Sequence, residues 1–201
     1  MQHYAMVLYL AVLLGGCGGG GGGGSSGIDP RLARLDIYEA QKQRVLGDPG
    51  AGVMAMTETA PENVPSGGDF VFQGSATVRV EDSVQPLVLI GDAVITLSFG
   101  AGSGIGQVTN VFGNNSAGTI VDYSGAINLE TMAAGAVMDF AYAGALTAIG
   151  ETLLFDGVMQ GTLLGNPVGA IAAADLEAVV DYNGRAADAT FVLIGETPVT
   201  P

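Results

Sequence analysis

Residues 136–149 read AVMDFAYAGALTAI, and this stretch decides the fold. Met138, Phe140 and Tyr142 occupy every second position, while smaller or charged residues stand between them. Successive side chains of a β-strand point to opposite faces of its sheet, so this alternation predicts a strand with one large apolar face.

Seven other stretches are similarly rich in Val, Ile, Thr, Phe and Tyr and are separated by Gly, Asn and Asp. The eight expected strands are 70–80, 87–99, 105–112, 119–129, 136–149, 153–164, 171–182 and 189–195. Because no helical pattern separates them, they predict an antiparallel barrel or sandwich. Closed as a barrel, eight strands leave an interior that side chains fill or that holds one small ligand. Glycines within the strands (Gly74, Gly125, Gly144 and Gly157) suit the bends and bulges that closure requires.

A barrel that itself spans a membrane is an alternative, because alternation alone does not say which face of a strand is apolar. Membrane barrels carry aromatic girdles at both interfaces. Only 6% of this chain is aromatic, and it has no Trp. We therefore favour a barrel that lies outside the bilayer.

The N-terminus has the pattern of a lipoprotein signal peptide. Residues 5–14 (AMVLYLAVLL) form a ten-residue apolar run, too short to span a bilayer, and Gly15, Gly16 and Cys17 follow it. This resembles the lipobox of bacterial lipoproteins, which implies cleavage between Gly16 and Cys17 and acylation of Cys17. The leading residues MQHY lack the usual Lys or Arg, and a buried apolar strand or helix with an incidental Cys is the alternative.

The sequence between Cys17 and the strands divides into three segments. Residues 17–28 hold an unbroken glycine run and predict a flexible tether. Residues 29–47 predict a short helix, because Asp29-Pro30 is a typical N-cap pair and Gly47 a typical stop. Pro49, Pro61 and Pro65 indicate an irregular linker over 48–68, so that the barrel domain is 69–196.

The expected helix carries most of the basic residues of the chain, at Arg31, Arg34, Lys42 and Arg44. They could contact anionic headgroups or a partner. The alternative is a helix that packs on the barrel through an apolar side (Leu32, Leu35, Val45 and Leu46) and leaves its basic face solvated.

Composition excludes several classes of function. The chain has 201 residues with 20 acidic and 6 basic side chains, a formal net charge of −14, which argues against nucleic acid as a partner. Its only Cys is Cys17 and its only His is His3, so a mature chain without residues 1–16 has no imidazole for a Ser-His-Asp triad or the usual zinc site. We expect a non-enzyme with no cofactor and no metal.

Three segments resemble one family. Residues 64–76 (VPSGGDFVFQGSA) are similar to the motif that opens the barrel in the group of surface lipoproteins containing transferrin-binding protein B and factor H-binding protein, with Phe72 where that group has Tyr. Residues 93–110 (AVITLSFGAGSGIGQVTN) resemble its glycine-rich hairpin, and residues 191–196 (FVLIGE) its last strand. The resemblance implies an eight-stranded antiparallel up-and-down β-barrel, displayed on the cell surface, that binds a partner.

Two functions remain open from the sequence. The first is a lipoprotein of the bacterial outer membrane, held by acyl chains on Cys17 and exposed at the cell surface or toward the periplasm, whose barrel binds a protein or small solute. Gly18, where many inner-membrane lipoproteins have Asp, favours the outer membrane by resemblance. The second is a structural envelope lipoprotein with no soluble ligand. A carboxylate-based hydrolase using pairs such as Asp175 and Glu177 is disfavoured, since acidic turns and solvated strand faces are common.

Overall fold

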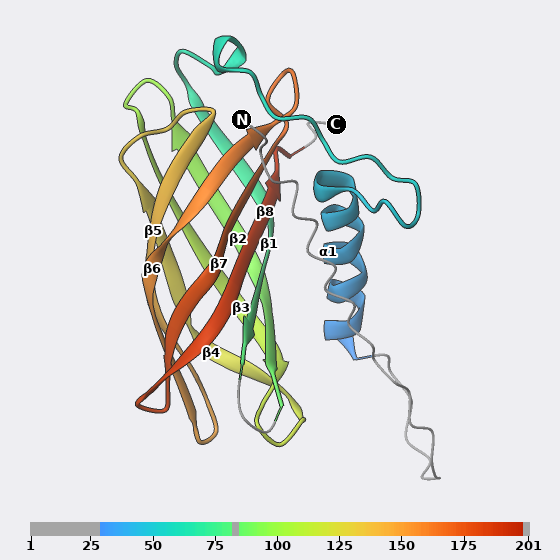
Figure 1. The fold of residues 1–201 in the computed structure, drawn as a ribbon, viewed down its shortest axis with the longest axis vertical. Helices are drawn as coiled ribbons and strands as arrows, with labels where there is room; N and C mark the ends of the chain where they lie inside the picture. The colour runs from blue at the N-terminus through green and yellow to red at the C-terminus, as the bar shows by residue number, and fades with distance from the viewer. Residues whose placement is uncertain (1–28, 82–84, 199–201) are drawn as a thin grey trace.

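Eight antiparallel strands form a closed barrel in the computed structural model, which describes residues 29–81 and 85–198. Each strand pairs with the next along the chain, and the last pairs with the first (Figure 1). The strands are β1 (Asp69–Val80), β2 (Leu87–Ser98), β3 (Ser103–Asn114), β4 (Ile120–Thr131), β5 (Val137–Ala148), β6 (Glu151–Leu164), β7 (Ala170–Tyr182) and β8 (Arg185–Glu196). The predicted up-and-down barrel is confirmed, and the sandwich alternative is wrong.

One strand begins earlier than the sequence pattern indicated. We expected the last strand to start at residue 189, but β8 starts at Arg185. The tight turn explains the difference: Asn183 and Gly184 both have positive φ, at 53° and 79°. Two consecutive residues in this conformation make a two-residue hairpin turn, so pairing resumes at once although the following residues are polar or small.

The barrel interior is the hydrophobic core. As predicted, Met138, Phe140 and Tyr142 on β5 point inward and are buried. Phe72 from β1 and Phe191 from β8 meet them there, and each is at most 1% exposed. Within the described residues, large apolar side chains thus fill the interior, and most charged side chains of the strands lie outside, with Glu151 at the start of β6 as a buried exception. A barrel that spans a membrane shows lipid an apolar exterior instead.

The strand glycines have two different roles. Gly125 and Gly157 lie where strand registers shift, in agreement with the expected bulges. Gly74 and Gly144 lie in regular ladders, so the prediction of a bend or bulge is wrong for them. A Cβ at Gly74 would sit 2.1 Å from the carbonyl oxygen of Ile194, so its hydrogen is needed for close approach of the neighbouring strand.

Helix α1 (Pro30–Leu46) has the predicted ends. Asp29 caps its N-terminus by accepting a hydrogen bond from the Arg31 backbone amide at 3.0 Å, and Gly47 ends it with a φ of 76°. No helix among the described residues is long and apolar enough to cross a membrane.

The predicted apolar side of α1 is correct for Val45 and wrong for Leu32 and Leu46. Leu32 is 49% exposed and Leu46 is 38% exposed, whereas Gln41 and Val45 are buried. The side that faces the barrel is largely polar, because Arg34, Tyr38, Gln41 and Val45 recur at the spacing of one helix face. Hydrophobicity therefore does not determine how this helix is oriented.

The linker over residues 48–68 is irregular, as predicted, but part of it is held on the barrel. It contains only a short 3-10 helix, η1 (Pro61–Asn63). The Thr59 amide donates to the Leu163 carbonyl at 2.8 Å, and the Thr59 hydroxyl donates to the Gly165 carbonyl at 2.7 Å. In Figure 1 the linker runs over the rim at the top of the barrel.

Helix α1 runs from one rim of the barrel to the other, starting at the rim that is farther from the linker. We call the rim that carries the linker and the β2–β3, β4–β5 and β6–β7 turns the linker rim, and the other the opposite rim. The start of α1 lies toward the opposite rim, where Arg31 approaches Asp122 near the beginning of β4. Its end lies toward the linker rim, where Val45 packs with Ile194. Figure 1 shows α1 extended along the outside of the barrel between the two levels.

Candidate functional site

The predicted lipidation site lies outside the described residues. Gly16 and Cys17, the signal peptide over 1–16 and the tether over 17–28 are all in this part of the chain. They stay predictions from the sequence. The site that the structure does describe is the contact of α1 with the barrel wall, which we call the helix–barrel crevice.

A charged network joins the first half of α1 to β2 and β3. The Arg34 guanidinium donates to the Asn110 carbonyl at 2.8 Å and lies 3.4 Å from the Asp92 carboxylate. Asp92 accepts hydrogen bonds from the Tyr38 hydroxyl and from the Asn110 amide. The same guanidinium lies 4.8 Å from the ring centre of Phe112, which faces outward yet is 3% exposed. Charge and an aromatic ring together hold this end of the helix.

A bulge in β3 places these groups. Pairing with β4 shifts register between Val108 and Val111, and pairing with β2 shifts beside it. Asn110 lies within the shift and has a positive φ of 51°. An extra residue in one strand re-aims the side chains around it. Here it turns Asn110 and the following Phe112 toward the helix.

Burial and hydrogen bonding shift two titrations in this network. Burial first, and then the hydrogen bond to Asp92, raise the pKa of Tyr38 to about 12. Burial alone would raise the pKa of Asp92, but hydrogen bonds from Tyr38 and Asn110 and the charge of Arg34 outweigh it, so the pKa lies below its usual value. Tyr38 is therefore neutral and Asp92 charged at neutral pH, which keeps their hydrogen bond directional.

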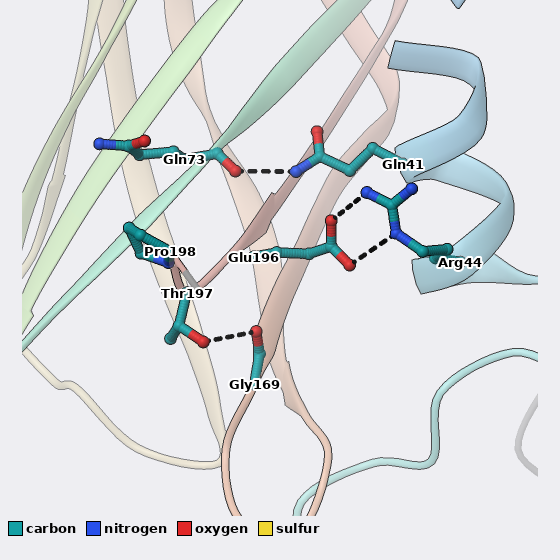
Figure 2. A pocket seen from close by; sticks show the side chains of 7 residues that line it. All are labelled: Gln41, Arg44, Gln73, Gly169, Glu196, Thr197 and Pro198. Atoms are coloured by element: carbon teal, nitrogen blue, oxygen red, sulfur yellow. Dashed lines mark hydrogen bonds and ion pairs between the residues drawn. The ribbon is translucent and has the colours of Figure 1, made fainter. Parts of the chain in front are cut away.

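A cavity lies at each end of the crevice. One of about 610 Å³ is lined by Asp29, Pro30, Arg31, Arg34 and Asp122. The other, of about 470 Å³, is lined by Gln41, Arg44, Gln73, Gly169, Glu196, Thr197 and Pro198 and is drawn in Figure 2.

The second cavity is bordered by two contacts between α1 and the barrel. The Gln41 amide donates to the Gln73 carbonyl at 2.8 Å, and Arg44 contacts both carboxylate oxygens of Glu196, at 3.2 and 2.7 Å (Figure 2). The hydrogen bond to Glu196 raises the pKa of Arg44 above its usual value. The Arg44 side chain is 59% exposed, so an incoming carboxylate could exchange with Glu196 on it.

The basic residues of the helix thus have a different role from either one expected. Arg31, Arg34 and Arg44 form ion pairs with barrel carboxylates at 3.8, 3.4 and 2.7 Å. Their side of the helix is not a solvated face. Lys42 instead pairs along the helix with Glu39.

The carboxylates Asp175 and Glu177, noted as a pair in the sequence, lie in different surroundings, and the further acidic neighbours Glu81 and Asp82 give no described pair. Asp175 accepts a hydrogen bond from the Tyr142 hydroxyl at 2.8 Å, while Glu177 is exposed. Glu81 pairs with Arg79, and Asp82 lies outside the described residues. Over the described ranges, no three His, Cys, Asp or Glu side chains come together as a metal site. The crevice offers hydrogen bonds and exchangeable charges, which suit recognition.

A polar group that the sequence did not single out lies at the opposite rim. Glu151 is 5% exposed and accepts from the Ser116 amide at 2.6 Å and the Tyr123 hydroxyl at 2.7 Å. Burial opposes its ionisation, but these hydrogen bonds and one from Tyr182 hold its pKa below the usual value. Acidic residues near turns are common, so nothing in the sequence marked this one as buried.

Comparison with known proteins identifies no family for this chain. No protein-family model matches the sequence. No curated protein matches it either. Among solved structures it is similar to the vaccine antigen transferrin-binding protein B of Haemophilus parasuis Hp5. A double mutant matches with a TM-score of 0.49 and 13% identity over 72% of this chain and 28% of that one, and a single mutant with 0.48 and 12% over 72% and 29%.

The chain therefore spans under a third of the length of these two proteins. A similarity at this level carries no argument about fold, ligand, activity or location. The family resemblance drawn from the sequence motifs stays a prediction.

Proposed function

We propose that this chain is a lipid-anchored, non-catalytic binding protein of the bacterial outer membrane. Its barrel would present its outer surface to a protein or small-solute partner. The observation that carries the proposal is the filled interior. With Phe72, Phe140 and Phe191 packed in the lumen, recognition by the barrel belongs on its outer wall and rims.

The anchor in this proposal rests on the sequence before the described residues. The apolar run and Gly15-Gly16-Cys17 give the pattern of a cleaved and acylated N-terminus. Two or three acyl chains on Cys17 would hold the protein stably, since a single chain gives only marginal binding. In this proposal the outer leaflet of the outer membrane is the site of display, and residues 17–28 are the tether.

The anchor is tested by Cys17→Ala in cells labelled with radioactive palmitate. We expect the label to be lost and the protein to leave the membrane fraction. Ser25→Ala, in the tether, is the matched control and should keep both. Membrane association of the Cys17→Ala chain without label would contradict lipid anchoring.

Display and binding need separate measurements. Protease treatment of intact cells should cleave the barrel domain if it faces outward, and protection of residues 69–196 would contradict surface display. The full-length chain, purified in detergent, serves as bait against cell-surface and host extracts. Failure to recover any partner would favour the structural envelope lipoprotein. That alternative is supported by the exposed large apolar side chains of the described residues, which are aliphatic rather than the aromatics typical of binding hot spots.

A further inference from the structure

The outer wall formed by β5, β6 and β7 carries a cluster of exposed aliphatic side chains. Val158 on β6 stands directly opposite Ala141 on β5, and Leu154 stands opposite Ala145. On β7, Leu176 and Val179 face outward beside them. The four larger side chains, Leu154, Val158, Leu176 and Val179, are between 45% and 57% exposed. We call these residues, with the acids described next, the β5–β7 face.

Carboxylates surround the aliphatic cluster. Exposed acids stand on β5, β6, β7 and β8, namely Asp139, Asp156, Glu177, Asp181 and Asp188. Among the described residues, none of them forms an ion pair with a Lys or Arg. From residue 137 to 196 the sequence holds a single basic residue, Arg185, next to the β7–β8 turn. The face therefore has an uncompensated negative potential.

A bulge in β7 lies at the centre of this face. Pairing with β8 shifts register between Asp175 and Ala178, so that both Leu176 and Glu177 are directed outward. The pairing of β7 with β6 is also irregular here, because the register shifts between the pair Leu154–Asp181 and the pair Gln160–Ala174. The regular pairing of β6 with β7 is interrupted between these pairs, and the Glu177 amide donates to the Asp175 carboxylate at 3.1 Å.

A similar surface elsewhere on this barrel is covered by helix α1. Helix α1 docks at the β3 bulge around Asn110. There Arg34 donates a hydrogen bond to the Asn110 carbonyl, pairs with Asp92 and covers Phe112. Acidic side chains, an outward apolar residue and a bulge are present at both places. On the β5–β7 face, no described segment of the chain covers them.

We propose that the β5–β7 face docks a cationic amphipathic segment of a partner protein. Lys or Arg side chains of that segment would pair with Asp156 and Glu177, and its apolar side chains would cover Val158 and Leu176. The inference rests on the proposed binding function and specifies its partner and surface. The negative charge of the face disfavours a second copy of this chain, an anionic lipid surface or a nucleic acid as occupant.

The test uses the full-length chain in detergent and a fluorescein-labelled helical peptide built of Leu and Lys. A peptide of the same pattern with Glu in place of Lys is the control ligand. Fluorescence anisotropy should show binding of the Lys peptide, weakened by salt, and no binding of the Glu peptide. Failure of the Lys peptide to bind would overturn the proposal.

Variants locate the binding. The double variant Asp156→Asn/Glu177→Gln should lower the affinity for the Lys peptide at least tenfold. The double variant Val158→Ser/Leu176→Ser should lower that affinity about fivefold. The matched controls are Glu62→Gln in η1 and Ile105→Ser on β3, both exposed and away from the face, and each should change binding less than twofold. Equal losses in the face variants and the controls would show diffuse attraction to an acidic protein and overturn the proposal.

Two outcomes separate this inference from the proposed function. If the bait recovers a partner whose binding is unchanged by the face variants, the binding function holds and the β5–β7 face is not its surface. If the Lys peptide binds at the face but Cys17→Ala stays on membranes, the docking inference holds and the anchor fails.

Discussion

At the residue scale, Arg34 is the side chain that joins the most contacts between helix and barrel. Its guanidinium combines a ring contact with Phe112, a hydrogen bond to the Asn110 carbonyl and an ion pair with Asp92. A planar guanidinium can make all three at once, whereas the compact ammonium of Lys cannot. The exposed pair of Arg44 with Glu196 makes fewer contacts and is more accessible to water.

Replacement of Arg34 should therefore lower the free energy of unfolding more than replacement of Arg44. We expect Arg34→Ala to lower the free energy of unfolding by about 2–4 kcal/mol, the sum of a partly desolvated ring contact and one charged hydrogen bond. Arg44→Ala should cost below about 1 kcal/mol, as exposed pairs do. Urea unfolding measures both. Equal values for the two variants, or full rescue by Arg34→Lys, would contradict the role given to the planar group.

The buried carboxylate of Glu151 should make stability depend on acid. Its pKa is lowered in the fold, so its contribution is present above the unfolded value of about 4.3 and is lost as pH falls through the folded value. Glu151→Gln should lower the free energy of unfolding by about 1–3 kcal/mol at pH 7, because the hydrogen bonds from Ser116, Tyr123 and Tyr182 to a charge become bonds to a neutral amide. The cost should shrink below about pH 4.

Unfolding of both proteins between pH 7 and pH 3 measures this dependence. Glu62→Gln, an exposed residue of η1, is the control and should have no such cost. A cost of Glu151→Gln that is the same at pH 7 and pH 3 would mean that the carboxylate acts by shape rather than charge.

At the element scale, α1 shows where sequence reasoning succeeds and where it stops. The ends of the helix depend only on nearby residues, because Asp29 caps the first turn with its own side chain and Gly47 supplies a positive φ. Both ends could therefore be predicted. Its orientation depends on Asp92, Asp122 and Glu196, which come from three distant strands. No pattern within the helix reports those partners. The expected apolar side was therefore correct only at Val45, although the element was correct.

The strands were predictable for a related reason. Each strand buries one face along its whole length. This burial is visible in the sequence as apolar residues at every second position, as at Met138, Phe140 and Tyr142. The bulges that build the crevice and the β5–β7 face were predictable only in part. Each depends on a one-residue difference in register between neighbours. The traces in the sequence are Gly125 and Gly157, which were expected at bulges, and Asn110, a residue type that tolerates positive φ.

Val45 should be the one aliphatic residue of α1 that matters for docking. It is fully buried and packs with Leu164, Ala170 and Ile194, while Leu46 beside it is 38% exposed. Val45→Ala should lower the free energy of unfolding by about 1–2 kcal/mol, from the lost methyl groups and the cavity left behind. Leu46→Ala should cost under about 0.5 kcal/mol. A larger effect at Leu46 would mean that the helix docks through the side predicted from its sequence.

At the scale of the whole molecule, the reversed course of α1 fixes which rim faces away from an anchor. A tether that precedes Asp29 joins the helix at the level of the opposite rim. The linker rim then lies farther out, about 25 Å away along a 17-residue helix. An orientation of this kind would follow from the docking of α1 alone.

This orientation can be measured on cells. Single cysteines at Gly102, in the β2–β3 turn, and at Gly184, in the β7–β8 turn, would carry maleimide-biotin in chains that keep Cys17. We expect streptavidin to reach Gly102→Cys more readily than Gly184→Cys. Adding Arg34→Ala and Val45→Ala, which loosen the helix, should reduce that difference. Equal access in the parent chain would contradict a fixed orientation.

The same reversal makes the protein a natural carrier for inserted peptides. At Gly102 an added side chain would meet no atom within 4 Å, and the turn around it joins two strands whose pairing continues on both sides. A foreign epitope grafted there would stand on the outward rim, clear of the helix and the linker attachment at Thr59. If the proposed anchor and surface display hold, immunisation with whole cells would present that epitope away from the bilayer, without any change to the residues that hold the barrel closed.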